Sequence, residues 1–178
     1  MNIAVYLGSS FGTDPRIKIE TQRLGEWMGK KHHKLVYGGG KEGLMGILAS
    51  SVVENSGEVI GVELKMFCND GHAFDHCSEF HAVDTFFERK KIIMDLSDAF
   101  IALPGGPGTL DEISEIICQD RFQSYHRPIF FLNIDGFYDD IKHQFEKMVA
   151  FGFFRSEEYE NIYFVDDVDE LIKEFKKY

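Results

Sequence analysis

Apolar and polar positions follow two different periods along this chain. Short runs rich in β-branched and aromatic residues alternate with longer segments in which apolar residues recur every three or four positions. The short runs are largely apolar, which is typical of strands covered on both faces. They predict strands at Ile3–Leu7, Lys34–Tyr37, Glu58–Val62, Glu79–Val83, Ala99–Leu103 and Ile129–Leu132.

The longer segments predict helices between and after these strands. Their expected bounds are Pro15–Lys31, Gly43–Asn55, Phe86–Leu96, Thr109–Phe122, Gly136–Phe151 and Val168–Lys177. Strands that alternate with helices in this way are typical of a parallel sheet with crossover helices. We therefore expect an α/β layered fold. The 178 residues contain no internal repeat or linker and fit a single domain, 1–178.

The formal net charge of −11 disfavours DNA, RNA or an anionic membrane as a partner, because the general electrostatic attraction has the wrong sign. The sequence shows neither a secretory leader nor an apolar run long enough to span a bilayer. We expect a cytoplasmic protein with no nucleic-acid or membrane partner. A few backbone amides and one cation are still sufficient to hold a small phosphorylated ligand.

Glycines follow three of the predicted strands, in the segments 8–10, 38–40 and 104–109. Ligands of open parallel sheets bind beyond the carboxyl ends of the strands, so all three loops are expected at one crevice. The first loop lacks the glycine spacing of a dinucleotide fingerprint, and the chain has no Walker-type Gly-Lys-Ser/Thr. NAD-dependent and ATP-driven chemistry are therefore disfavoured.

The strongest local signal is the segment Leu103–Glu112, a glycine loop that runs from a strand into a helix. Glycines let a ligand approach the backbone, and the first helical turn offers unpaired amides to an anion. Glu112 falls about one turn along the same helix, within reach of a sugar attached to a bound phosphate. It would stabilise an oxocarbenium-like transition state, orient water or act as a nucleophile. A tight turn followed by an acidic first helical turn is the structural alternative.

Two other segments carry candidate chemistry. Arg89 lies in a run of four charges and is suited to bidentate contact with a phosphate, although such a run is more often a solvated helix face. Gly43 and Gly46 follow the second glycine loop, where close packing and ligand contact are equally good explanations.

Sulfur and imidazole side chains also recur between residues 68 and 81. They are Cys68, His72, His76, Cys77 and His81. A turn signal at Asn69–Gly71 interrupts them, and neither zinc-finger spacing nor an HExxH motif is present. We expect no metal.

Five segments occur together in one order. They are Gly8–Ser10, Tyr37–Gly46, Arg89–Lys90, Ser97–Glu112 and Pro128–Gly136. This set resembles the Lonely Guy (LOG) family of phosphoribohydrolases over nearly the whole chain. The resemblance implies a Rossmann-like three-layer sandwich with helices on both faces of a mainly parallel sheet. It also implies a homodimer that hydrolyses AMP or cytokinin riboside 5′-monophosphate to free base and ribose 5-phosphate, without a cofactor.

The family's essential Arg and Glu fall on Arg89 and Glu112, which we expect to be catalytic. The residues expected to contact the substrate are Gly8, Ser9, Gly39, Gly40, Lys90, Gly105, Gly106, Gly108 and Thr109. Phe86 and Phe87 stand where the family usually has Met-His, which leaves the base specificity open. Pro107 supplies no N–H to a phosphate. By resemblance, a second subunit completes the crevice near residues 86–90.

Two alternatives to hydrolysis differ in how well the sequence supports them. A nucleotide-binding or carrier protein on the same fold is the alternative to an enzyme, because a fold does not establish catalysis. A pyridoxal phosphate decarboxylase needs a Schiff-base lysine and a partner for the pyridinium nitrogen, and the sequence contains no motif for either.

Overall fold

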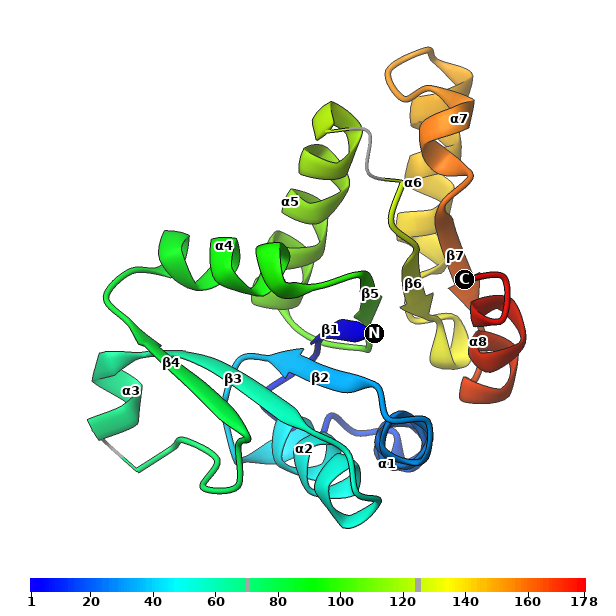
Figure 1. Cartoon of the computed structure of the whole chain (residues 1–178). Coiled ribbons are helices and arrows are strands. Elements are labelled where there is room, and N and C mark those ends of the chain that lie inside the picture. Colours follow the sequence, from blue (N-terminus) through cyan, green and yellow to red (C-terminus); the bar gives the residue numbers. More distant parts are fainter. Residues whose placement is uncertain (70, 124–125) are drawn as a thin grey trace.

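The computed structural model describes residues 1–69, 71–123 and 126–178. Within these residues, seven strands form one sheet in which every pairing is parallel (Figure 1). The order across the sheet is β4-β3-β2-β1-β5-β6-β7. Their bounds are β1 Asn2–Tyr6, β2 Lys34–Tyr37, β3 Val59–Leu64, β4 Glu79–Val83, β5 Ala99–Ala102, β6 Ile129–Leu132 and β7 Ile162–Val165.

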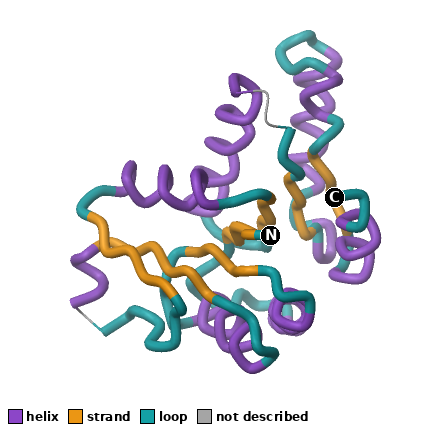
Figure 2. The backbone as a smooth tube through the Cα atoms, viewed as in Figure 1, coloured by secondary structure: helices purple, strands orange, loops and turns teal. Residues whose placement is uncertain are grey.

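Helices cover both faces of the sheet (Figures 1 and 2). The helices are α1 Pro15–Lys30, α2 Gly43–Glu54, α3 Lys65–Asn69, α4 Phe86–Leu96, α5 Pro107–Gln123, α6 Asp139–Ala150, α7 Ser156–Tyr159 and α8 Val168–Phe175, with a 3₁₀ turn, η1, at Ile134–Gly136. Helices α1, α2 and α8 share one apolar core with the sheet, and α4, α5 and α6 share the other. The expected Rossmann-like three-layer sandwich is confirmed.

Each predicted strand and helix is present, with the ends of the strands within two residues of the prediction. The prediction missed the four-residue strand β7 and the short helices α3 and α7. It was wrong about β4 as a strand covered on both faces. Only Val83 of that strand is buried, since β4 lies at the edge of the sheet and pairs with β3 alone.

Two helix starts also differ from the prediction. Gly136 adopts a positive φ of 72° in η1, a conformation that glycine tolerates and that ends the turn, so α6 begins only at Asp139. Helix α5 begins at Pro107 rather than Thr109, because proline is favoured at the first helical position, where no intrahelical amide bond is required.

The sheet separates the two cores, and successive side chains of each strand point alternately into one core and the other. Ile3 and Val5 of β1 face α1 and α2, whereas Ala4 and Tyr6 face α4 and α5. No helix in the described part of the chain is both long and apolar enough to cross a membrane.

The order of the strands reverses between β1 and β5. The chain proceeds from β1 outward to β4, and then returns to place β5 on the other side of β1. The loops after β1 and β5 consequently lie side by side, and the Gly8 N–H donates to the Pro104 carbonyl at 3.3 Å. Such a switch point is where open α/β sheets bind ligands.

Candidate functional site

A cavity of about 320 Å³ opens at the switch point. Its walls are the loop after β1, the loop after β5, the start of α2 and the residue that follows η1. The residues that line it are Gly8, Ser9, Ser10, Phe11, Gly12, Ile17, Leu44, Pro104, Gly105, Gly106 and Phe137. The first and third glycine loops therefore meet as expected, whereas residues 38–40 of the second loop do not line this cavity. Phe137 is a wall that the sequence motifs did not indicate.

The glycines at the start of α5 fall into two classes. A Cβ on Gly105 would lie 2.2 Å from the Thr109 Oγ1 and 3.0 Å from the Gly8 nitrogen, so packing requires glycine there. Gly106 and Gly108 have no positive φ, and a Cβ on either would meet nothing within 4 Å. Neither conformation nor packing requires glycine at these two positions. Their bare backbone leaves the amides of the first turn of α5 open to a ligand.

Arg89 and Glu112 form an ion pair beside this loop. The Arg89 Nη1 donates to the Glu112 Oε1 at 2.6 Å, and the Arg89 Nε donates to the Val62 carbonyl at 3.0 Å. The side chains of Arg89 and Glu112 are only 14% and 15% exposed. Arg89 thus reaches from α4, across the carboxyl end of β3, to α5.

Local features fix the position of Arg89. Helix α4 begins with a capping box in which the Thr85 hydroxyl accepts from the Glu88 N–H and the Glu88 carboxylate accepts from the Thr85 N–H. A Cβ on Gly38, directly after β2, would lie 2.2 Å from the Arg89 Nη2. The bare Gly38 backbone therefore makes room for the guanidinium.

The electrostatic environment of Glu112 is set by burial and by Arg89. Burial raises the pKa of Glu112, and the Arg89 guanidinium lowers that pKa in part. Burial also raises the pKa of the Tyr6 phenol, and the Glu112 charge raises it further, which keeps this phenol protonated. A carboxylate in such a site is well suited to stabilise positive charge that develops on a bound sugar.

Other expected contact residues have protein partners. Lys90 Nζ lies 2.6 Å from the Glu115 Oε2 and 3.2 Å from the Asp111 Oδ2, so it joins α4 to α5. The carbonyl of Gly39 accepts from the Phe74 N–H. The carbonyl of Gly40 accepts from the Tyr37 hydroxyl. Substrate contact by Lys90, Gly39 and Gly40 stays a prediction.

The remaining expected contacts differ in exposure. Ser9, Gly106 and Gly108 are exposed, whereas Thr109 is only 4% exposed. Sequence reasoning placed Gly38 in the second glycine loop without assigning it a role, and it did not identify Tyr6 or Glu63. Glu63 carried a visible signal, because it is the one charged residue in the otherwise apolar run Val59–Leu64.

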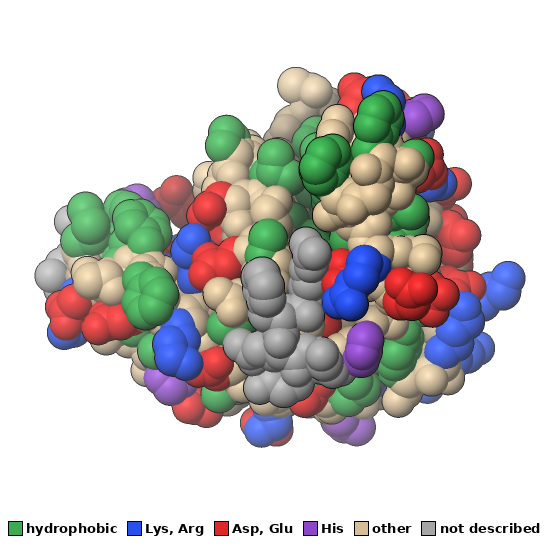
Figure 3. All heavy atoms as spheres, turned by 90° about the horizontal axis from the view of Figure 1, so that it is seen from above, with side chains coloured by type: hydrophobic (Ala, Val, Ile, Leu, Met, Phe, Trp, Pro, Cys, Tyr) green, Lys and Arg blue, Asp and Glu red, His purple; other side chains and the backbone are tan. Residues whose placement is uncertain are grey.

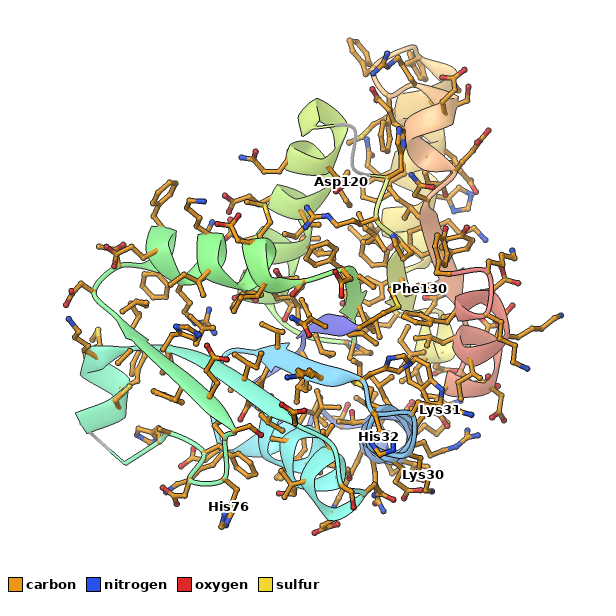
Figure 4. All side chains as sticks on the ribbon, in the orientation of Figure 1. Lys30, Lys31, His32, His76, Asp120 and Phe130 are labelled. Atoms are coloured by element: carbon orange, nitrogen blue, oxygen red, sulfur yellow. The ribbon has the colours of Figure 1, made fainter. Side chains whose placement is uncertain are left out.

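The cysteine and histidine run does not form a metal site in the part of the chain that the structure describes, where no three His, Cys, Asp or Glu side chains gather as ligands. Asp70, within the predicted turn, lies outside the described residues. His76 is exposed on the loop before β4, below the sheet edge in Figure 4. Burial raises the pKa of the Cys77 thiol to about 11, so this thiol is protonated at neutral pH.

The sequence model of a family described as possible lysine decarboxylase matches residues 45–175. The chain is 36% identical over 151 residues to the probable cytokinin riboside 5′-monophosphate phosphoribohydrolase LOGL5 of Oryza sativa subsp. japonica. The aligned residues make up 85% of this chain and 61% of LOGL5. This chain thus spans less than two thirds of the length of LOGL5. It is 34% identical over 176 residues to the cytokinin riboside 5′-monophosphate phosphoribohydrolase LOG3 of Arabidopsis thaliana, covering 99% of this chain and 82% of LOG3.

A solved structure of the molybdenum cofactor carrier protein of Chlamydomonas reinhardtii is similar in fold. Its TM-score is 0.77 at 19% sequence identity, over 99% of this chain and 96% of that one. At that identity the similarity shows a shared fold and nothing more.

The space at Gly38 can be tested by a double-mutant cycle. Gly38→Ala is expected to lower the free energy of unfolding by about 1–3 kcal/mol, because the new methyl group displaces the Arg89 guanidinium from Glu112. In an Arg89→Ala background the same substitution should cost at least about 1 kcal/mol less. Denaturant unfolding of the four proteins measures this coupling, and an equal cost in both backgrounds would contradict it.

Proposed function

We propose that this chain, which belongs to the LOG family, is a nucleoside 5′-monophosphate phosphoribohydrolase. It hydrolyses the N-glycosidic bond of AMP or of a cytokinin riboside 5′-monophosphate and releases the free base and ribose 5-phosphate. The names of its relatives support this reaction. The observation that carries the proposal is the buried Arg89–Glu112 pair beside the open first turn of α5.

Phosphate binding depends on the backbone. The free amides of Gly106, Gly108 and Thr109 face the anion, while Pro107 has no N–H to offer. Glu112 follows Thr109 by three residues, a rise of about 4.5 Å along the helix, which suits a ribose attached to the phosphate.

The reaction breaks the bond between C1′ and the base nitrogen, and the bonding electrons leave with the base. A water oxygen bonds to C1′, and a proton is taken up by the departing base. Glu112 stabilises the positive charge that develops on the ribose during bond cleavage. Arg89 lowers the pKa of the buried Glu112 and thereby favours its ionised form before substrate binds.

Lys90 argues against a Schiff-base decarboxylase, despite the description of the family model. A lysine that forms Schiff bases needs a lowered pKa. The carboxylates of Glu115 and Asp111 instead raise the pKa of Lys90, the lysine next to Arg89. Its ammonium group is held in ion pairs rather than available as a nucleophile.

Incubation with AMP should release adenine, measured by chromatography, and a panel of other nucleoside monophosphates defines the base preference. Glu112→Gln and Arg89→Ala are each expected to lower kcat by about 100-fold or more, because each removes a charge at the reacting sugar. Lys91→Ala is the control, since Lys91 is exposed on α4 and pairs with Asp95 at 2.5 Å. Full activity in both site variants would refute the assignment, and AMP binding without cleavage by the wild type would favour the carrier alternative.

The contrast between Gly105, which packing requires, and Gly106, which it does not, provides a second test. Gly106→Ala should leave folding intact and weaken ribose 5-phosphate binding by about tenfold, because the methyl group occupies the approach to the amides. Gly105→Ala should instead destabilise the fold by about 1–3 kcal/mol through its clash with Thr109. Calorimetric titration and thermal unfolding separate the two effects. Unchanged binding by Gly106→Ala would contradict the placement of the phosphate.

We also propose that two copies of the chain associate through the surface formed by α3, β4 and the starts of α4 and α5. Apolar side chains gather on this surface, on the left of Figure 3. They are Met66, Phe67, Phe86, Phe87 and Leu110, each at least 37% exposed. A patch of this kind favours a protein interface. Arg89 follows Phe86 and Phe87 on α4, so the partner copy would lie close to the site.

Phe87→Glu is expected to convert the dimer to a monomer, because it places a charge in the apolar contact. Phe87 is 69% exposed in the single chain. Phe153→Glu is the matched control, since Phe153 is 77% exposed on the loop after α6. Sedimentation velocity measures the mass of each protein. A monomeric wild type, or an unaffected Phe87→Glu dimer, would count against this interface.

A further inference from the structure

Glu63 is a buried carboxylate beside the catalytic arginine. Its side chain is 11% exposed, and its Oε1 lies 3.6 Å from the Arg89 Nε. The same oxygen accepts the Leu64 N–H at 2.8 Å. Burial raises the pKa of Glu63, and the Arg89 charge lowers it in part. A buried carboxylate is costly without a counter-charge, and Arg89 supplies one.

Arg89 therefore lies between two carboxylates, one on each side. Glu112 pairs with Nη1 at 2.6 Å from α5, and Glu63 lies next to Nε at the end of β3. These carboxylates differ in their surroundings. Gly39 lies directly over Glu63, since a Cβ on Gly39 would be 3.2 Å from the Glu63 Cβ and 3.1 Å from the Phe80 ring. Packing thus fixes the position of Glu63. Glu112 instead follows the first turn of α5, where Gly106 and Gly108 leave space for a ligand.

This difference matters once a nucleotide binds. Under the proposed function, on which this inference rests, Glu112 turns from Arg89 toward the ribose. The guanidinium then loses its 2.6 Å partner in a site where its own side chain is only 14% exposed. An uncompensated charge in such a site is strongly unfavourable. Glu63 is the carboxylate that stays within ion-pair distance.

We propose that Glu63 is a positioning residue that keeps the Arg89 guanidinium at the end of β3 while Glu112 engages the ribose. Val62 contributes a neutral acceptor to the same nitrogen, and Glu63 contributes the charge. Arg89 thereby remains beside the ribose throughout the reaction, with Glu112 free to face C1′.

Glu63→Gln tests the role of the charge. The amide has the shape of the carboxyl group and retains an oxygen for the Leu64 N–H. With AMP as substrate, kcat is expected to fall by about tenfold, because Arg89 is misplaced once Glu112 turns to the ribose. In ¹⁵N NMR spectra of the complex with ribose 5-phosphate, with the signal assigned by Arg89→Lys, the Arg89 Nε–H of the variant should exchange with solvent at least about tenfold faster than in the wild type.

Glu79→Gln is the matched control. It removes a carboxylate from neighbouring β4 that is 55% exposed and pairs with His81, so kcat and the Arg89 signal should both stay unchanged. If Glu63→Gln does not fold, Glu63→Asp, which withdraws the charge by one methylene group, should produce smaller changes in the same direction.

An unchanged kcat or an unchanged Arg89 exchange rate in the Glu63 variant would overturn the inference. A wild-type protein that cleaves none of the nucleotides would refute the proposed function instead. In that case the exchange rate of the Arg89 Nε–H still decides whether Glu63 holds Arg89.

Discussion

The ion pair between Arg89 and Glu112 connects the parts of this molecule that matter for its chemistry. It joins α4 to α5 over the carboxyl end of β3, with Nη1 and Oε1 2.6 Å apart. A buried pair of this kind gains little stability, because both groups lose their hydration. The fold nevertheless makes room for it, through the bare Gly38 backbone and the Val62 carbonyl.

Under the proposed function, the charge balance of the site explains how an acidic protein can hold a phosphate. Arg89 is paired with Glu112, and Lys90 with Asp111 and Glu115, before any ligand binds. Neither cation is without a carboxylate. The amides at the start of α5 are consequently the groups best placed to receive an anion, and their dipoles favour negative charge regardless of the net charge of −11.

Much of this arrangement could be predicted from the sequence, because its signals are local. A glycine loop between a strand and a helix indicated the start of α5, and Glu112 followed from its distance along that helix. The contacts of Arg89 could not be predicted in the same way. Val62 lies 27 residues before it and Glu112 lies 23 residues after it, so these contacts depend on strand order and helix placement. The exposure of β4 depends on its place at the sheet edge, which no local pattern contains.

The structural alternative for Glu112, an acidic residue that merely favours a helix start, explains less than the catalytic interpretation. A first-turn acid stabilises a helix from beside the free amides, but α5 begins at Pro107 and has no acidic residue in its first turn. Glu112 lies further along the helix, is 15% exposed and has a pKa raised by burial. Apolar residues would serve stability there at least as well. Buried charges at the open end of a parallel sheet, next to glycines that packing does not require, are instead typical of a site shaped for a reaction.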